Sequence, residues 1–341
     1  AFDYTGVDGR TLTLNAVNNI NISAGINSTG TSLLHLVLSA GGSVTTTADI
    51  DTNGGNITIT AVGAVSLNTI TTAGGSLTVD AGTTLALTAA VSTGGGFVDL
   101  DALGALTMTA AVTTGGGNFT ATSGGLLTTN AITVGTGAIT LVADEVDLAA
   151  SASGIGGTLT IRGVTGGQDI ILGAGSETVG NLTDLDLTTS DLSNILAGFT
   201  QITIGDAAAS GTVSVVGVSN FADSLTIRSS TFSVGVGASL NTSDDILTIF
   251  ADSMTLSGNV NSGTAMTWIR PTTAGQLIDL GGADAAGTLG ISATDLTRLV
   301  TTGVLRIGDA TAGNITVTAA FAPAGTLGTL SLETGGSITD T

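Results

Sequence analysis

The chain alternates apolar and polar residues in short runs that recur about every 20 residues. The runs ITI, LTV, VDL, FTA, ITL and LTI begin 20 or 21 positions apart, at Ile57, Leu77, Val98, Phe119, Ile139 and Leu159. Alternation with a period of two indicates a β-strand with one buried face. Glycine pairs between the runs, such as Gly54-Gly55 and Gly74-Gly75, predict turns.

Two further apolar ladders follow each of these runs. The second is Val65/Leu67, Leu85/Leu87, Leu106/Met108, Leu126/Thr128 and Val146/Leu148, and the third is Ile70, Val91, Val112 and Ile132. Three such short strands can form one triangular turn of a coil, in which each strand pairs in parallel with its counterpart one repeat later. The pattern therefore predicts an all-β parallel β-helix, a solenoid of ~20-residue three-strand turns, roughly 16 of them.

Within each first run, the residue between the two apolar positions is expected to point outward. These residues are Thr58, Thr78, Asp99, Thr120, Thr140 and Thr160. After Gly163 the spacing loosens, and the apolar pairs become Val213/Val215, Leu225/Ile227, Leu247/Ile249, Met266/Trp268, Leu305/Ile307, Ile315/Val317 and Leu330/Leu332. We expect regular turns over 1–163 and looser turns with loops over 164–341, in one continuous solenoid.

A longer repeat of about 103 residues lies in the second half, where 187–217 resembles 291–319. Asp191 corresponds to Asp295, and Asp206 corresponds to Asp309. Each copy predicts a short helical insertion of two turns at most, DLSNIL or DLTRLV, capped by Ser190 or Thr294. Asp206 and Asp309 each follow a strand in an IGDA turn, which predicts an Asx-type turn.

Composition supports a folded β protein. Only 9% of the residues are charged, against about 25% in an average domain, but 42% are hydrophobic and the branched strand formers are abundant. Disordered chains lack such residues. No apolar run approaches the ~18 residues of a membrane span.

The net charge of −20, from 26 acidic and six basic residues, argues against nucleic acid and anionic membrane surfaces as partners. The absence of cysteine excludes disulfides and thiolate metal sites. The chain begins without Met and ends in the middle of a repeat, so we expect it to be processed or cut from a longer protein.

The acidic pairs are the weak candidates for metal binding. Calcium needs several converging oxygens, for which we single out Asp99, Asp101, Asp144 and Asp147. The calcium-binding nonapeptide of β-rolls is absent. We therefore predict no cofactor, with Ca²⁺ as the open alternative.

Catalysis is not expected. Some β-helix enzymes place carboxylates on adjacent turns of one face, and Asp80, Asp99 and Asp101 come nearest to that arrangement. The six arginines, however, are spread along the sequence, whereas a cleft for acidic sugars would need several together. We predict no catalytic or cofactor-binding residues and a protein that is not an enzyme.

Three kinds of single residue are expected to be structural. His35, the only histidine, lies in the apolar segment LLHLVL and is interpreted as a strand residue without a chemical role. Asn56, Asn118 and Asn314 open strands, which suggests turn or stacking roles rather than glycosylation. Trp268 and Tyr4 lie far apart in the sequence and only weakly favour a glycan groove.

Several segments resemble the repeats of filamentous haemagglutinin-like adhesins, the large bacterial exoproteins of two-partner secretion. They are TLTLNAVNNINIS (Thr11–Ser23), GGNITITAVGAVSLNTITTAGG (54–75), ITLVADEVDL (Ile139–Leu148) and RIGDATAGNITVTAA (Arg306–Ala320). The resemblance implies a right-handed parallel β-helix, export through the outer membrane and a place in an extracellular or cell-surface fibre. No NPNG-type motif of the family's secretion domain is present, and no catalytic residues carry over.

We therefore expect a non-enzymatic extracellular structural or adhesive rod, the subunit of a surface fibre or filament. Its partners would be further copies stacked end to end, or neighbouring repeats of a longer chain, together with host or cell-surface glycans or proteins. Two alternatives stay open: a polysaccharide-processing β-helix enzyme, and a carbohydrate- or receptor-binding module on the irregular segment Gly163–Asp206.

Overall fold

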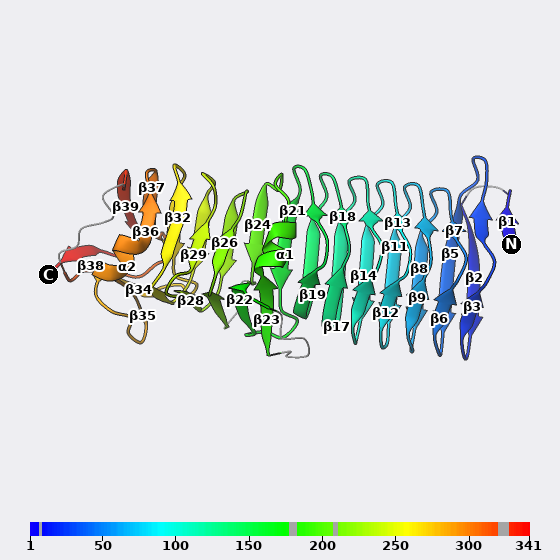
Figure 1. Cartoon of the computed structure of the whole chain (residues 1–341), viewed down its shortest axis with the longest axis horizontal. Coiled ribbons are helices and arrows are strands. Elements are labelled where there is room, and N and C mark those ends of the chain that lie inside the picture. Colours follow the sequence, from blue (N-terminus) through cyan, green and yellow to red (C-terminus); the bar gives the residue numbers. More distant parts are fainter. Residues whose placement is uncertain (7–8, 177–182, 207–210, 320–326) are drawn as a thin grey trace. The chain divides into compact units, whose positions relative to one another are not determined.

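The computed structural model describes residues 1–6, 9–176, 183–206, 211–319 and 327–341. Its strands stack in parallel as a β-solenoid of about 15 turns, which confirms the predicted fold class, including the two short helices (Figure 1). The chain forms two compact units. The first holds Ala1–Thr160 and Asn194–Phe199, and the second holds the rest of the described chain.

The first unit has three strands in each turn, one on each of three faces. The first face consists of β2 (Arg10–Ala16), β5 (Leu34–Ala40), β8 (Ile57–Ala61), β11 (Leu77–Ala81), β14 (Val98–Ala102), and the first parts of β17 (Phe119–Thr129) and β19 (Ile139–Leu148). The second consists of β3 (Ile20–Ile22), β6 (Val44–Thr46), β9 (Val65–Leu67), β12 (Leu85–Leu87), β15 (Leu106–Met108), and the second parts of β17 and β19. The third consists of β1 (Phe2–Tyr4), β4 (Ile26–Ser28), β7 (Ile50–Asp51), β10 (Ile70–Thr71), β13 (Val91–Ser92), β16 (Val112–Thr113), β18 (Ile132–Thr133) and β20 (Ala152–Ser153).

Register between successive turns matches the predicted repeat. Leu77 pairs with Ile57 on one side and Val98 on the other, and Ile70 pairs with Ile50 and Val91. The inward Ile, Val and Leu side chains are almost fully buried. Since each turn buries its apolar residues only against the adjacent turns, the repeat spacing sets the register directly.

One prediction on the second face is wrong by one residue. Leu127 and Thr129 are the buried residues in the second part of β17, and Leu127 pairs with Leu106, whereas Leu126 and Thr128 face outward. The strand continues through a register irregularity between Ser123 and Leu126. Since one inserted residue reverses every following side chain, a ladder read by constant spacing fails at this point.

A column of threonine and glycine closes the turns of the first unit. Each buried threonine hydroxyl donates to the carbonyl of the glycine three residues later, as Thr93 does to Gly96 at 2.5 Å. A Cβ on Gly96 would lie 2.0 Å from the carbonyl oxygen of Gly75 in the preceding turn, so only glycine fits. The same hydroxyl-to-glycine bond joins Thr52 to Gly55, Thr72 to Gly75, and Thr114 to Gly117. The repeated GG pairs are therefore required by the close approach of stacked turns.

The second unit keeps the three faces but has less regular turns. Its first face consists of β21 (Thr158–Arg162), in which the unit begins, β24 (Gln201–Ile204), β27 (Leu225–Arg228), β30 (Leu247–Phe250), β33 (Thr267–Arg270), β37 (Val304–Asp309) and β39 (Thr329–Thr334). The second consists of β22 (Asp169–Ala174), β25 (Thr212–Val215), β28 (Thr231–Val234), β31 (Ser253–Leu256), β34 (Leu277–Gly281), β38 (Ile315–Val317) and β40 (Ile338–Asp340). The third consists of β26 (Val218–Asn220), β29 (Ser239–Asn241), β32 (Asn259–Gly263) and β36 (Leu299–Thr301).

Two insertions interrupt this pattern, where the long sequence repeat predicts them. Each adds a strand parallel to a second-face strand and then a six-residue helix: β23 (Asp184–Thr188) with α1 (Thr189–Asn194), and β35 (Thr288–Ser292) with α2 (Ala293–Arg298). β23 pairs with β22, and β35 pairs with β34. Residues 177–182, which precede β23, and residues 207–210 of the first repeat copy lie outside the described part of the chain.

The helix caps differ from the prediction by two residues. Ser292 caps α2 through a capping box, because its hydroxyl accepts from the N–H of Asp295 while the Asp295 carboxylate accepts from Ser292. Thr188 and Asp191 make the same reciprocal bonds at α1. The aspartates therefore occupy the third helical position, and Ser190 and Thr294 do not cap the helices.

Another sequence prediction fails at β33, where Met266 and Trp268 were expected to form an inward pair. Thr267 and Ile269 are the buried residues instead, and Trp268 faces outward. A polar residue can take the inward position because the hydroxyls of Thr267 and Ser262 bond to each other at 2.8 Å.

Candidate functional site

The predicted calcium candidates lie on two separate strands. Asp99 and Asp101 face outward from β14, and Asp80 on β11 pairs in register with Asp101. Asp144 and Asp147 lie on β19, beyond the intervening strand β17. Among the described residues, no group of three or more His, Cys, Asp or Glu side chains is placed to hold a metal ion.

The surroundings of Asp99 shift the pKa of its carboxyl. Its half-buried position raises the pKa of the carboxyl above its ordinary value, and the adjacent Asp101 raises it further. Both effects disfavour the charged form. The outward face of β14 therefore carries a mildly repulsive acidic pair.

Aspartates in the second unit serve mainly as hydrogen-bond acceptors for backbone N–H groups of other turns. Asp252 accepts from the N–H groups of Thr272 and Thr273, and Asp244 accepts from that of Thr264 at 2.7 Å. A carboxylate bond to an N–H group is stronger than a neutral one. These acids therefore hold loops of unequal length in register.

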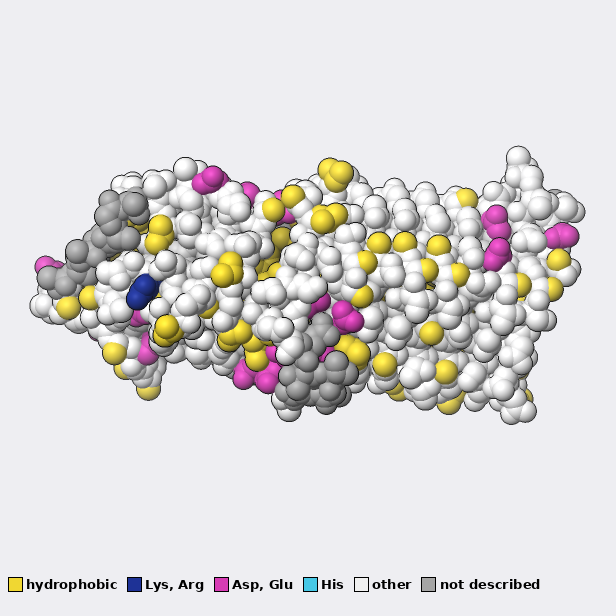
Figure 2. All heavy atoms as spheres, in the orientation of Figure 1, with side chains coloured by type: hydrophobic (Ala, Val, Ile, Leu, Met, Phe, Trp, Pro, Cys, Tyr) yellow, Lys and Arg dark blue, Asp and Glu magenta, His cyan; other side chains and the backbone are white. Residues whose placement is uncertain are grey.

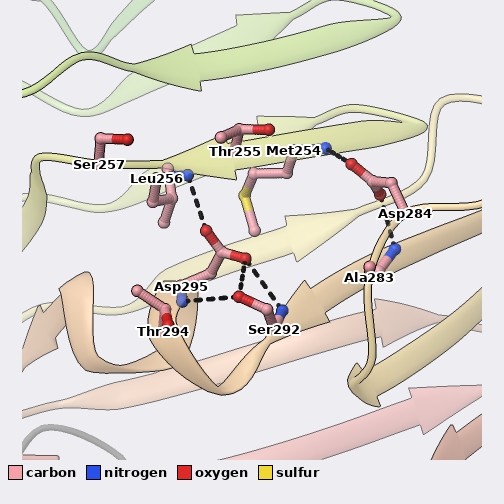
Figure 3. A pocket seen from close by; sticks show the side chains of 10 residues that line it. Met254, Thr255, Leu256, Ser257, Ala283, Asp284, Ser292, Thr294 and Asp295 are labelled. Carbon is pink, nitrogen blue, oxygen red and sulfur yellow. Dashed lines mark hydrogen bonds between the residues drawn. The ribbon is translucent and has the colours of Figure 1, made fainter.

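The densest example lies where α2 and β35 interrupt the second face (Figure 3). β31 is the last strand of one sheet and β35 the first strand of another. Asp284 accepts from the N–H of Met254 at 2.8 Å, and Asp295 accepts from the N–H of Leu256 at 2.7 Å. The two carboxylates thus replace the carbonyls that a following strand would offer to β31.

A cavity of about 430 Å³ adjoins these carboxylates. Asp284 also accepts from Ser253 and from the N–H of Gly290, and Asp295 also accepts from the N–H and hydroxyl of Ser292. Each carboxylate has therefore at least three donors. Such saturation suits an acid that holds backbone in place, because a general base needs a free lone pair directed at its substrate.

A stack of arginines and aromatic rings covers the outward side of β27, β30, β33 and β37. The Arg228 guanidinium lies 4.1 Å from the Phe250 ring centre, and Arg270 lies 4.6 Å from Phe250 and 4.8 Å from Trp268. Arg306 covers Trp268 at 4.6 Å. Three of the six arginines therefore come together, so the interpretation that they are spread out is wrong in three dimensions.

Ion pairs and one indole hydrogen bond complete this stack. Arg270 pairs with Asp309, Arg306 pairs with Glu333, and the Trp268 indole donates to the Gly308 carbonyl at 2.8 Å. Burial acts to raise the pKa of Asp309. Hydrogen bonds from Thr311 and the N–H of Ala312, together with the Arg270 charge, outweigh burial and hold that pKa below its ordinary value.

Asp309 also confirms the predicted Asx turn, since its carboxylate accepts from the N–H groups of Thr311 and Ala312. For Asp206, the turn residues that follow lie outside the described part of the chain, and its carboxylate lies 3.9 Å from Arg162.

Side chains at or just before the starts of strands replace backbone carbonyls as acceptors for the next turn. Asn56, Asn118 and Asn314 accept from the N–H groups of Ser76, Ala138 and Ser337, which confirms their predicted stacking role. His35 does the same, because its Nδ1 accepts from the N–H of Asn56 at 3.0 Å. The histidine is a strand residue, as predicted, with a specific hydrogen-bonding task.

The surface is largely uncharged. On the face drawn in Figure 2, acidic side chains lie in small separate groups among neutral polar atoms. Neither described helix is long and apolar enough to cross a membrane. No family model, curated protein or solved structure matches the chain.

Proposed function

We propose that this chain is a non-enzymatic structural or adhesive protein that works outside the cell or on a bacterial surface. The observation that supports a structural role is the use of its polar side chains. Buried threonine hydroxyls donate to backbone carbonyls, and asparagine and aspartate side chains accept from backbone N–H groups, commonly those of an adjacent turn. The extracellular location and the adhesive role rest on the resemblance to haemagglutinin-like repeats.

Unpaired strand edges support the proposed end-to-end partners. Among the described strands, β2 pairs with β5 alone and β39 pairs with β37 alone. A parallel strand edge offers a row of free N–H and C=O groups to any matching edge. A second copy or the neighbouring repeats of a longer chain could extend the coil there.

Electron microscopy of the purified chain over a range of concentrations, with and without chelator, tests this proposal. Filaments with a regular axial repeat would support self-association, and their loss in chelator would implicate calcium. A surface-labelling and attachment assay in the source organism, with and without the gene, tests the adhesive role. If cells without the gene attach as well as the wild type does, or if the protein is confined to the cell interior, the adhesive role is contradicted.

The polysaccharide-processing alternative has one specific observation in its favour. Asp80, Asp99 and Asp101 share the outward face of adjacent strands, and the pKa of Asp99 is raised. Incubation with acidic and neutral polysaccharides, followed by a reducing-end assay, tests this alternative. Product release that is lost in Asp99→Asn would replace the structural proposal with an enzymatic one.

A further inference from the structure

A small cavity beside the end of α2 contains an arginine that has no acidic partner among the described residues. The cavity has a volume of about 240 Å³ and is lined by Gly237, Ala238, Ser239, Ser257, Gly258, Asn259 and Arg298. Arg298 is the last residue of α2, and the other lining residues come from the starts of β29 and β32 and from the turns before them. The helix insertion thus places a cation over the third face.

Arg298 stands out because acids outnumber bases 26 to six in this chain. Arg162, Arg270 and Arg306 each have a carboxylate partner, and Arg228 lies against Phe250. Within the described residues, Arg298 forms no ion pair, and the same holds for Arg10, which is exposed on β2. The Nε of Arg298, like those of Arg270 and Arg306, is buried without a hydrogen-bond partner. Arg298 is half-buried, and a buried guanidinium nitrogen without a partner is costly. The natural complement of a guanidinium fork is a carboxylate.

The corresponding residue of the first insertion shows that the helix does not require an arginine there. Asn194 occupies the equivalent position 104 residues earlier, and its amide donates to the Leu148 carbonyl at 2.6 Å. The described lining of the cavity beside α1, which consists of Thr189, Leu192, Ser193, Val218 and Asn220, includes no charged side chain. The cation is therefore specific to the second insertion.

The rest of the lining suits a hydroxylated ligand. Ser239 and Ser257 supply hydroxyls and Asn259 supplies an amide, each able to bond sugar hydroxyls. Val236, next to the cavity in sequence, is an apolar side chain with 90% of its surface exposed, and it could pack against the C–H face of a ring. The volume accommodates one monosaccharide unit.

We propose that this cavity binds the uronic acid unit of an acidic glycan, with Arg298 pairing with its carboxylate. Ser239, Ser257 and Asn259 then bond the ring hydroxyls. The site is independent of the proposed structural role, because a rod, a fibre subunit or an enzyme could each carry it. Its ligand chemistry follows from the unpaired guanidinium and its polar surroundings.

Titration of the whole chain with D-glucuronate, D-glucose and acetate tests the proposal. Binding is measured by calorimetry and by changes in amide chemical shifts. We expect saturable binding of glucuronate with shifts at Ser239, Ser257 and Asn259. Binding of glucose and of acetate should each be at least tenfold weaker, a difference of about 1.4 kcal/mol. Equal binding of glucuronate and glucose, or no glucuronate binding, would overturn the proposal.

Arg298→Asn introduces the residue of the first insertion and should weaken glucuronate binding at least tenfold while leaving the melting temperature unchanged. Arg10→Asn, a substitution on an exposed strand of the first unit, is the matched control and should bind as the wild type does. Unchanged binding in a folded Arg298→Asn variant would refute the role of Arg298. If the chain proves to be structural or adhesive but does not bind glucuronate, only the proposed site is overturned. If the chain proves to be intracellular but binds glucuronate, only the proposed function is overturned.

Discussion

The two units use different side chains to provide hydrogen-bond partners for the backbone groups at the corners between strands. Wherever strands stop pairing, backbone N–H and C=O groups still need partners. In the first unit, turns of nearly equal length place backbone directly over backbone, and neutral Thr and Gly residues complete the bonds. In the second unit, turn length varies and two insertions interrupt a face, so ionised aspartates reach across the gaps.

Turns of equal length therefore need no charged side chain as a hydrogen-bond acceptor at their corners. A stacked glycine column depends on steric fit alone, whereas an aspartate acceptor depends on its ionisation. We therefore expect the two units to respond oppositely to mild acid. In the first unit Asp99 has a raised pKa, and in the second unit Asp309 has a lowered pKa.

The strongest way to break the first unit is Gly96→Ala. The new Cβ would lie 2.0 Å from the Gly75 carbonyl oxygen, so the backbone of two turns must separate. We expect a loss of about 3 kcal/mol or more in local unfolding free energy, with increased hydrogen exchange in β13 and β14. Gly166→Ala, where a Cβ meets nothing within 4 Å, is the control and should change stability by less than about 0.5 kcal/mol. Equal effects of the two substitutions would contradict the steric argument.

The matching test in the second unit is Asp295→Ala. It removes the acceptor of the Leu256 N–H and the carboxylate half of the α2 capping box, and it leaves buried donors without partners. We expect a loss of about 2–3 kcal/mol, seen as faster hydrogen exchange in β31 and α2. Thr294→Ala on the exposed side of the same helix should be nearly neutral. A small effect of Asp295→Ala would show that β31 does not depend on this carboxylate.

Acid should remove a smaller contribution from the second unit through Asp309. A lowered pKa in the folded state means that the ionised carboxylate stabilises the fold above the ordinary aspartate pKa, and that this stability is lost as pH falls through the folded value. Asp309→Asn should therefore cost about 1 kcal/mol at neutral pH and progressively less in acid. Urea unfolding at several pH values measures this, with the exposed Asp340→Asn as the control. A cost independent of pH would rule out the ionic contribution.

The smallest expected effect has the opposite sign and lies in the first unit. A raised pKa means that the charged Asp99 destabilises the fold at neutral pH, and that this penalty is relieved as pH falls through the raised value. Asp99→Asn should then gain a few tenths of a kcal/mol at neutral pH and nothing at a pH below the ordinary aspartate pKa. In Asp101→Asn, an NMR titration should show a lower pKa for Asp99 than in the wild type. An unchanged Asp99 pKa would mean that its neighbour contributes nothing.

Much of the fold was predictable because its core is local in sequence. Residues such as Leu77 and Val98 pair one turn apart, so the repeat spacing of about 20 residues already predicts their contact. The predictions failed where one residue changed the register. Leu126 and Trp268 were both expected to be buried, and both face outward because an irregularity or a hydrogen-bonded inward threonine shifted the pattern.

The candidate sites were less predictable, because they join residues distant in sequence. Arg228 and Arg306 belong to one stack although 78 positions separate them. Arg298, which lines the proposed glucuronate site, is far from Ser239 in the chain, and nothing in the helical pattern distinguishes it. Its one sequence signal was the replacement of Asn194 by Arg298 between otherwise similar repeats.

The three-strand turn, the parallel pairing, the outward threonines and the positions of both insertions can all be predicted from the amino-acid sequence. These features follow from periodicity, since each turn is packed against a near copy of itself. The contacts of the polar side chains are evident only from the tertiary structure. They include the carboxylates at the edge of β31, the arginine–aromatic stack and the position of Arg298 in its cavity. Those contacts depend on insertions that change the stacking of faces, and no repeat period specifies where an inserted segment packs.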